Sequence, residues 1–425
     1  MTFTIKLKSL IIGIISTMQY CFNILIWLYL KRKKIFTKSS NSTILYIPCD
    51  PWSVWGSRGD EAMIYSSIAL LKKTYSTAKF CFITSTDKGV LETQTRGYNA
   101  IKAWEGKYPI YQIAKVIREI KPIKVIIIGA DCMDGYYSPD VSFTLMAVAD
   151  LCQNYNISYN ILGFSFNENP SWKIKFAYTF CSPSVRFNLR DYYSQQRFEY
   201  FTHKKSTLVS DMAFLLEPDK NFLDFKEYQE WCEKKKEKQH IIVGFNFHPM
   251  LKKSQSTEEI KMACFNLAEM LIQLIDSYKN LSILLIPHDN RGKISDTVVL
   301  PIIAEQIRDR GYADYIKEIK SVYHASQIKA LASLCDIMIC SRMHLAIGAL
   351  SLGVPVMAAT YQGKFHGLFK HYGLPENLLL SPSDFITEQF VSTFEYLFNN
   401  KCLLKNTLKN KQIYINRLSL KNIEV

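Results

Sequence analysis

The chain has 425 residues, of which 48% are hydrophobic and 13% are aromatic. This length exceeds one ordinary domain, and the apolar content supplies two buried cores, which excludes extensive disorder. The net charge is +14, and residues 1–38 hold seven basic side chains and no acidic one. Basic ends on a mixed-charge body favour an anionic membrane surface as a partner. No nucleic-acid-binding module is recognisable, so we expect no nucleic acid partner.

Eleven cysteines are scattered along the chain, without a CxxC pair or a Cys/His cluster of zinc-like spacing. Most of them lie in apolar segments, where cysteine behaves as a small hydrophobic residue. We therefore expect a reducing, cytosolic compartment and no metal site.

An uncharged stretch, Ser9–Leu30, precedes the basic run Lys31–Lys34. It is long enough to cross a bilayer, for which about 20 apolar residues are needed, although Ser16, Thr17, Gln19 and Asn23 interrupt it. The basic run stands where a signal peptide would need small residues for cleavage, and it would keep the body in the cytoplasm. We predict a membrane-anchoring or interfacial helix within residues 1–38, on the inner face of the cell membrane. A buried core helix is the alternative.

From Thr43 onward, short β-rich runs alternate with amphipathic stretches, as is typical of βαβ units and parallel sheets. In the first half the predicted strands are Ile44–Ile47, Phe80–Ile83, Val125–Ile128, Tyr159–Phe164, Arg186–Leu189 and Thr207–Val209. The predicted helices between them are Asp60–Lys73, Ile110–Ile120, Asp140–Asn154 and Asp191–Tyr200. In the second half we predict strands His240–Phe245, Leu281–Ile286, Ile337–Cys340 and Val354–Ala358, with helices Thr257–Tyr278 and Asp296–Arg308.

A charge-dense stretch at residues 217–239 interrupts this rhythm and is interpreted as a linker. The pattern predicts an α/β fold with two Rossmann-like domains facing a cleft, preceded by the apolar N-terminal helix. The expected limits are 43–216 for the N-terminal domain and 240–380 for the C-terminal domain, with C-terminal helices at 381–425. Ligands of such sheets bind at the carboxyl ends of the strands, so the residues that follow the strands are the candidates for a site.

In the N-terminal half, polar residues follow two of the predicted strands. Gly59, Asp60 and Glu61 open a helix after the first strand. Gly59 allows a close approach of the backbone, and Asp60 is either a helix cap or a carboxylate that takes a proton from a substrate hydroxyl. Arg190 follows a later strand and either pairs with Asp191 or binds an anionic ligand.

In the C-terminal half, two histidines follow neighbouring strands. One strand ends at Asn246 and His248, and the next ends at His288. A lone histidine at such a place is often structural, but two at adjacent strand ends favour a ligand site.

The strongest motif is Ser341-Arg342-Met343-His344, between a strand and a helix. We expect Ser341 to cap the helix, whose first N–H groups attract an anion, and Arg342 to add a guanidinium suited to carboxylate or phosphate. The helix dipole disfavours a charged imidazole at His344, and a bound dianion reverses that bias, so we expect His344 to donate a proton only with the anion bound. Lys364 follows the next strand at the same end.

Together these segments resemble the polysaccharide pyruvyl transferase family. The resemblance covers about 43–375 and rests on Gly59-Asp60-Glu61-Ala62, Arg190-Asp191 with Ser194, Ser210-Asp211-Met212-Ala213-Phe214, Pro287-His288, and Ser341-Arg342-Met343-His344 with Gly353-Val354-Pro355-Val356. It implies a GT-B-like fold, with the donor on the C-terminal domain and the acceptor on the N-terminal domain. It also implies transfer of a pyruvyl group from phosphoenolpyruvate to a sugar of a surface polysaccharide or its lipid-linked precursor, forming a ketal without a cofactor.

The resemblance also assigns roles to residues. It implies that Arg342 binds the donor and that His344 is the catalytic acid. From the chemistry of the residues, we also expect Asp60 to be catalytic as the base, and Ser341, Arg190, His288 and Lys364 to take part in binding the donor. Residues expected on the acceptor or cleft side are Gly59, Glu61, Asn246 and His248.

The chain departs from the family pattern in two places. Ser57-Arg58 stands where asparagine is usual, and Gly129-Ala130-Asp131 stands where three glycines are common.

Two other functions stay open. One is a GT-B-type glycosyltransferase with a sugar-nucleotide donor, since a fold does not determine its donor. The other is a non-catalytic scaffold of polysaccharide assembly.

Overall fold

The computed structural model describes residues 2–33, 42–249, 256–291, 295–360 and 363–423, and for residues 2–15 the backbone alone. The chain folds into two compact units. The first unit comprises residues 1–55, 67–211 and 421–425, and the second comprises residues 56–66 and 212–420.

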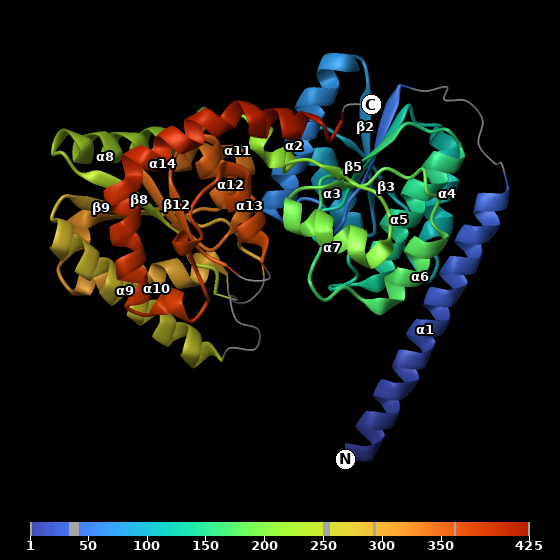
Figure 1. The fold of residues 1–425 in the computed structure, drawn as a ribbon, viewed down its shortest axis with the longest axis horizontal. Coiled ribbons are helices and arrows are strands. Elements are labelled where there is room, and N and C mark those ends of the chain that lie inside the picture. Colours follow the sequence, from blue (N-terminus) through green and yellow to red (C-terminus); the bar gives the residue numbers. More distant parts are fainter. Residues whose placement is uncertain (1, 34–41, 250–255, 292–294, 361–362, 424–425) are drawn as a thin grey trace. The chain divides into compact units, whose positions relative to one another are not determined.

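The first unit is built on a parallel sheet with the strand order β3-β2-β1-β4-β5 (Figure 1). These strands are β1 (Thr43–Ile47), β2 (Lys79–Thr84), β3 (Asn99–Lys102), β4 (Lys124–Ile128) and β5 (Tyr159–Leu162). A separate parallel pair is formed by β6 (Asn188–Leu189) and β7 (Thr207–Leu208). The helices of this unit include α3 (Asp87–Thr95), α4 (Pro109–Ile120), α5 (Pro139–Asn154), α6 (Trp172–Phe180) and α7 (Tyr192–Thr202). Runs such as Val125–Ile128 are buried on both faces, as the strands of a parallel sheet covered by helices must be.

The second unit is built on a parallel sheet with the order β10-β9-β8-β11-β12-β13. Its strands are β8 (Ile241–Phe245), β9 (Leu281–Leu285), β10 (Ile316–Glu318), β11 (Ile337–Cys340), β12 (Val356–Ala359) and β13 (Leu379–Leu380). Its helices are α8 (Phe225–Glu237), α9 (Thr257–Tyr278), α10 (Asp296–Asp309), α11 (Ala325–Ala332), α12 (Met343–Ser351), α13 (Lys364–Tyr372) and α14 (Gln389–Leu420). Short 3₁₀ helices lie at Met212–Leu215, Ala313–Tyr315, Glu376–Leu378 and Asp384–Ile386.

Both sheets have the doubly wound order of Rossmann-like domains. In each, the chain starts in the middle, moves to one edge and then returns to build the other side. The order therefore reverses between β1 and β4 in the first unit and between β8 and β11 in the second. The predicted α/β class with two Rossmann-like domains is confirmed.

Helix α2 (Arg58–Thr74) is divided between the units, because its first turns group with the second unit and its remainder with the first. The predicted linker, residues 217–239, contains helix α8 and groups with the second unit. The prediction missed β3, β10 and β13. All three are short, and β3 and β10 carry partly exposed polar residues instead of a continuous apolar run.

The predicted N-terminal segment forms helix α1 (Thr2–Arg32), which packs against α4 and α5. The residues of α1 that face the first unit are Tyr20, Asn23, Ile24, Trp27 and Leu30, all buried. Within the described ranges, no helix combines the length and the apolar content that crossing a membrane requires.

Candidate functional site

Two polar segments meet where the strand order of the second sheet reverses. Strand β8 is followed by Asn246 and His248, and its neighbour β11 is followed by Ser341 and Arg342. The hydroxyl of Ser341 accepts a hydrogen bond from the backbone N–H of His248 at 2.5 Å, which joins the two strand ends. Such a switch point is the place where doubly wound sheets bind ligands.

The start of helix α12 differs from the prediction that Ser341 caps it, and that prediction is wrong. The N-cap residue is Arg342, with extended backbone angles (φ −102°, ψ 117°) and no side-chain hydrogen bond to the first amides. The hydroxyl of Ser341 is engaged by His248 instead. Because the side chain of the N-cap residue makes no capping hydrogen bond, the start of α12 keeps the partial positive charge that attracts an anion.

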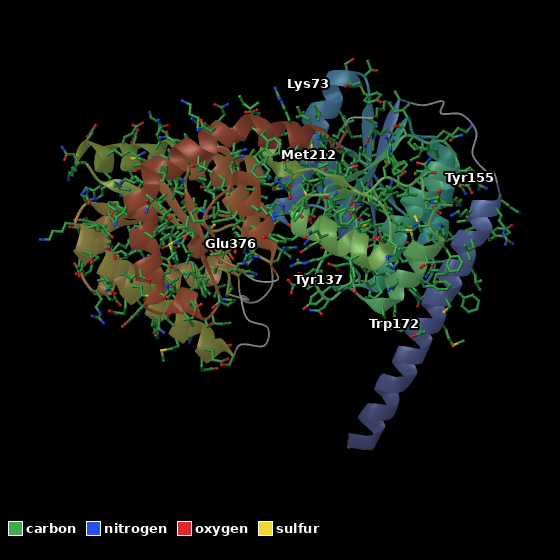
Figure 2. All side chains as sticks on the ribbon, viewed as in Figure 1. Lys73, Tyr137, Tyr155, Trp172, Met212 and Glu376 are labelled. Atoms are coloured by element: carbon green, nitrogen blue, oxygen red, sulfur yellow. The ribbon has the colours of Figure 1, made fainter. Side chains whose placement is uncertain are left out.

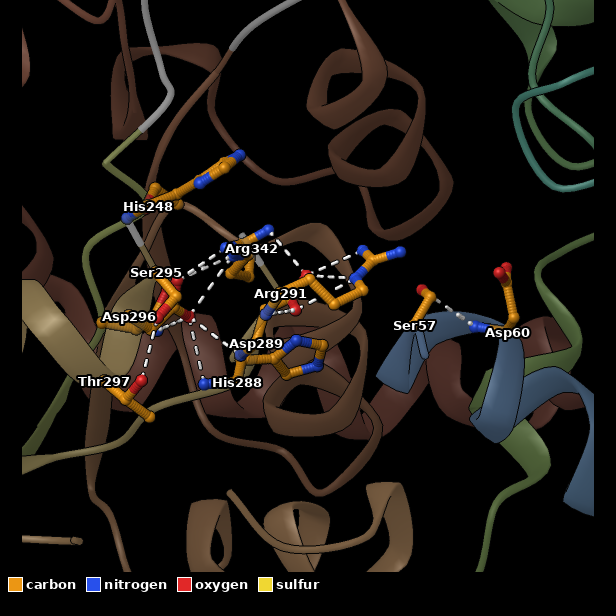
Figure 3. Close-up of polar contacts among 12 residues, drawn as sticks. Ser57, Asp60, His248, His288, Asp289, Arg291, Ser295, Asp296, Thr297 and Arg342 are labelled. Atoms are coloured by element: carbon orange, nitrogen blue, oxygen red, sulfur yellow. Dashed lines mark hydrogen bonds and ion pairs between the residues drawn. The ribbon is translucent and has the colours of Figure 1, made fainter. Parts of the chain in front are cut away.

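Arg342 is anchored by two carboxylates (Figure 3). Its Nη2 lies 2.6 Å from Asp296 Oδ1, its Nε donates to both oxygens of Asp296, and its Nη1 lies 3.3 Å from Asp289 Oδ2. The Arg342 side chain is nevertheless 15% exposed. These contacts fix the direction of the guanidinium and leave further N–H donors for a carboxylate or phosphate.

Asp296, which the sequence did not single out as a site residue, is the centre of this network. It is the first residue of α10 and is fully buried. Its Oδ2 accepts hydrogen bonds from the Asn246 side chain at 2.9 Å and from the backbone N–H groups of His288 at 3.0 Å and Asp289 at 3.2 Å. A buried carboxylate needs such donors and a cation, and Arg342 supplies the cation. The sequence signal, an acidic residue that opens a helix, is shared by ordinary helix starts.

Asp289 is the second carboxylate and is held between two arginines. Arg291 Nη2 lies 2.7 Å from its Oδ2, which also contacts Arg342. Burial acts to raise the pKa of Asp289, but hydrogen bonds from Arg291 and the charges of both arginines outweigh it and lower the pKa to about 2. The two arginines and the carboxylates of Asp289 and Asp296 thus form a compact, balanced charge cluster.

The two predicted histidines lie beside this cluster. Burial, with the charge of Arg342 as the next cause, lowers the pKa of His248 to about 3. Burial likewise lowers the pKa of His288 well below its ordinary value, with further lowering by Arg342 and His344. Both imidazoles are therefore neutral at pH 7, and each offers one N–H donor and one acceptor nitrogen.

His344 lies in the first turn of α12 and packs against the start of α2. A β-carbon on Gly59 would lie 2.3 Å from His344 Nδ1 and 2.5 Å from its Cε1. Real β-carbons do not approach other atoms so closely, so the imidazole occupies this place because residue 59 is glycine. The contact brings the first-loop motif and the C-terminal motif together within the second unit.

A small cavity beside His344 is rich in groups that can carry positive charge. His344, His288, Arg58 and Lys329 are among the residues that line it. Lys329 lies on α11 and donates to the Phe214 carbonyl at 3.1 Å. Burial lowers the pKa of Lys329 to about 8. Sequence reasoning missed Lys329, because a lysine on an amphipathic helix ordinarily faces solvent.

A family model described as polysaccharide pyruvyl transferase matches residues 58–363. The chain belongs to the polysaccharide pyruvyl transferase family. It is therefore a transferase, and the matched region begins at Arg58 and extends past Arg342 and His344. No curated protein matches the chain.

Solved structures similar to this pyruvyl transferase support a GT-B-like fold. A glycosyltransferase from Rickettsia africae ESF-5 is 15% identical with a TM-score of 0.56, over 91% of this chain and 97% of that chain. A putative UDP-N-acetylglucosamine 2-epimerase from Listeria monocytogenes is 12% identical with a TM-score of 0.55, over 89% and 95%. A UDP-GlcNAc 2-epimerase from Neisseria meningitidis, bound to UDP-GlcNAc, is 13% identical with a TM-score of 0.51, over 89% and 97%. At such identities the similarity concerns the fold alone.

Arg190 of the pyruvyl transferase lies in the first unit and is only 5% exposed. Its Nη1 lies 2.8 Å from Asp211 Oδ2, and its Nε donates to Ser165 Oγ at 2.7 Å. Burial acts to lower the pKa of Arg190, but Asp211 and other nearby aspartates outweigh it and raise the pKa. Asp191 instead caps α7 by accepting from the Ser194 N–H at 2.8 Å. The principal ionic partner of Arg190 is thus Asp211.

Glu61, expected on the acceptor side, lies in the second unit with a fully buried side chain. Its carboxylate lies 2.8 Å from His324 Nδ1 and 3.1 Å from Arg58 Nη1, and it accepts from the Ala325 N–H at 3.0 Å. These contacts fix the beginning of α11 against α2. A carboxylate at a helix N-terminus is favoured electrostatically. These contacts give Glu61 a structural role, which is to hold the start of α11 in place.

Asp60 is half-buried in the first turn of α2. Its backbone N–H donates to Ser57 Oγ at 3.4 Å, so Ser57 takes the capping position. Figure 3 shows Asp60 on the far side of Ser57 from Arg342.

Lys364 is the first residue of α13, and its charge contributes to the lowered pKa of His248. In the part of the chain that the structure describes, no group of three or more His, Cys, Asp or Glu residues is arranged to hold a metal ion.

Proposed function

We propose that this transferase moves a pyruvyl group from phosphoenolpyruvate to a sugar of a surface polysaccharide or its lipid-linked precursor, forming a ketal. We further propose that it acts at the cytoplasmic face of the cell membrane. The observation that carries the proposal is the anchored Arg342 at the N-terminus of α12, two residues before His344. Phosphoenolpyruvate carries a carboxylate and a phosphate, and both groups suit a guanidinium beside helix amides.

The donor site is prepared before the donor arrives. Asp296 accepts hydrogen bonds from two groups of Arg342, Nε and Nη2. The guanidinium therefore loses little conformational freedom when an anion binds. Because Asp289 and Asp296 balance Arg291 and Arg342, the positive potential for the donor comes from the helix amides and from Lys364. The neutral His288 and His248 offer hydrogen bonds to phosphate oxygens without a charge of their own.

The chemistry then needs one acid and one base. His344 gives a proton to the methylene carbon of phosphoenolpyruvate, which becomes a methyl group and leaves the adjacent carbon electrophilic. A sugar hydroxyl oxygen bonds to that carbon and passes its proton to Asp60. The carbon–oxygen bond to phosphate breaks, and the phosphate takes the proton from Asp60 as it leaves, which restores the Asp60 carboxylate. A second hydroxyl of the sugar closes the ketal, and its proton restores His344. The reaction as written uses protein side chains, the donor and the acceptor, without a cofactor.

The test is an assay of the full chain with phosphoenolpyruvate and a panel of galactosides and lipid-linked oligosaccharides. We expect release of inorganic phosphate together with a product heavier than the acceptor by the mass of one pyruvyl ketal. His344→Gln should lower the rate by about a hundredfold to ten-thousandfold, the usual contribution of a general acid. His203→Gln, at an exposed histidine of the first unit, is the matched control and should keep the rate.

A thermal-shift measurement, together with the phosphate-release assay, separates this proposal from a sugar-nucleotide glycosyltransferase. Phosphoenolpyruvate should raise the melting temperature of the wild type, and Arg342→Lys should reduce that shift. Stabilisation by nucleotide sugars with no response to phosphoenolpyruvate, and no phosphate release with any acceptor, would overturn the proposed donor.

A further inference from the structure

Helix α1 presents two different faces along its second half. One face is buried against the first unit. The opposite face exposes large apolar side chains, with Met18 57% exposed, Phe22 50%, Leu25 59% and Tyr29 54%. Their spacing of three or four residues places them on one stripe of the helix. An exposed apolar stripe of this length marks an interaction surface.

The buried face is fastened to the first unit by polar contacts. Trp27 Nε1 donates to Asp150 Oδ2 at 3.0 Å, and Lys31 Nζ lies 2.9 Å from the same oxygen. The hydroxyl of Tyr155, beside the end of α1 in Figure 2, donates to the Leu30 and Lys33 carbonyls. Asp150 is fully buried, so removing Lys31 and Trp27 from it would leave a buried charge without a cation. The second half of α1 therefore belongs to the folded body.

Helix α6 continues this surface. It exposes a second stripe at every fourth residue, with Trp172 75% exposed, Phe176 51% and Phe180 48%. The two helices are joined at both ends of α6, since Tyr20 donates to the Lys173 carbonyl at 3.0 Å and Lys31 donates to the Phe180 carbonyl at 3.0 Å. Figure 2 shows Trp172 beside α1.

The charged residues of α1 and α6 are all basic. Neither α1 nor α6 contains an aspartate or a glutamate. Basic residues stand among the apolar ones, at Lys31, Arg32, Lys173 and Lys175. Apolar and aromatic side chains next to lysine and arginine, without acidic neighbours on these helices, match the interface of a bilayer that contains anionic lipids.

We propose that the surface formed by α1 and α6 docks in the plane of an anionic lipid bilayer, without crossing it. The apolar stripes enter the boundary between headgroups and acyl chains, and Arg32, Lys173 and Lys175 contact lipid phosphates. The contacts of Trp27 and Lys31 with Asp150 persist in the bound state. This inference deepens the proposed location at the membrane, and it is independent of the proposed donor and acceptor.

The first experiment measures co-sedimentation of the full chain with vesicles of phosphatidylcholine, with or without phosphatidylglycerol. We expect binding to the anionic vesicles that weakens as salt is added. Phe22→Asp and Trp172→Asp should each weaken it at least about tenfold, because each removes an aromatic side chain from the apolar boundary. Leu223→Asp is the matched control, since Leu223 is 95% exposed in the second unit, and it should bind as the wild type does.

The second experiment separates docking from insertion. Lipids with brominated acyl chains quench nearby tryptophans, and we expect Trp172→Phe to remove most of the quenching while Trp27→Phe changes it little. Circular dichroism checks that each variant is folded. Equal binding to neutral and anionic vesicles, or binding unaffected by Phe22→Asp and Trp172→Asp, would overturn the proposal. So would quenching that depends mainly on Trp27, or a dimer that Phe22→Asp converts to a monomer in place of vesicle binding.

Discussion

Arg190 and Arg342 each follow a buried strand of a Rossmann-like unit, β6 and β11 respectively, and each is paired with aspartate. Their surroundings differ. Arg190 is 5% exposed, and its guanidinium is closed in by Asp211 and Ser165. Arg342 is 15% exposed, and its carboxylate partners orient it without enclosing it. We infer that a strand-end arginine serves as a binding group where its own fold leaves it partly open, and as a structural group where the fold encloses it.

The neighbours of the two arginines sharpen the contrast. Arg342 is itself the N-cap residue of α12 and makes no capping hydrogen bond, and beside it lies His248, whose pKa burial lowers to about 3. Beside Arg190 the helix start is already capped by Asp191. Lowered histidine pKa values and an open helix N-terminus together are typical of a ligand site. The comparison therefore predicts different consequences of mutation at the two arginines.

The largest expected effect is on stability, from Arg190→Met. This change leaves Asp211 buried without its cation, which typically costs about 3–5 kcal/mol of the free energy of unfolding. Chemical denaturation followed by circular dichroism measures it. If Arg190→Met keeps the wild-type stability but loses binding of phosphoenolpyruvate, Arg190 is a donor-binding residue and the contrast fails.

Arg342→Lys should instead act on catalysis. Lysine keeps a positive charge for Asp296 but lacks the planar fork, so stability should change less than with Arg190→Met. We expect kcat/KM for phosphoenolpyruvate to fall about a hundredfold to a thousandfold, as when one preorganised donor is lost. Steady-state kinetics on the folded variant measures this loss. A stability loss as large as that of Arg190→Met, with activity retained, would contradict the assignment.

Gly59→Ala tests the contact that unites the two motifs. The new β-carbon would lie 2.3 Å from His344 Nδ1, so the imidazole has to move. Moving a catalytic group by about 1 Å typically lowers the rate about tenfold to a hundredfold, and we expect this loss in kcat. The matched control is Gly348→Ala in α12, where the β-carbon meets Lys329 Cγ at an ordinary 3.7 Å. Similar losses in both variants would show that the effect does not come from His344.

The smallest effect concerns pH. Since the folded pKa of His248 is about 3, the unfolded chain binds more protons between pH 6.5 and 3, and stability falls as the pH is lowered through this range. Each such histidine contributes at most about 1.4 kcal/mol per pH unit. Denaturation at a series of pH values should give a shallower slope for His248→Gln than for the wild type. An unchanged slope would contradict the lowered pKa of His248.

Most of the fold could be predicted from the sequence, because its strands are short apolar runs bounded by polar turns. The strand Ile337–Cys340 and the helix Thr257–Tyr278 coincide with β11 and α9. Elements were missed where burial depends on partners elsewhere in the chain. Strand β3 has no apolar run of its own and is defined by its pairing with β2.

The site was predicted less completely, and the reason is also physical. Motifs report residues that are adjacent in sequence, as in Ser341-Arg342-Met343-His344. Asp296 and Lys329 belong to the site through contacts with distant segments, which no local pattern records. The position of Asp60 after the first strand suggested a place in the N-terminal half, whereas residues 56–66 group with the second unit.

That grouping has a consequence for engineering within this family. Helix α2 begins in one unit and ends in the other, and Asn422, beyond α14, accepts from the Gly163 N–H at 2.5 Å and donates to the Ser210 carbonyl at 2.9 Å. A chimera with a single crossover near residue 212 would take Gly59 from one parent and His344 from the other. It would also mismatch Asn422 with its two backbone partners. Exchanging one unit between two members of the family therefore calls for four junctions, near residues 55, 66, 211 and 420, with residues 56–66 kept in the second unit.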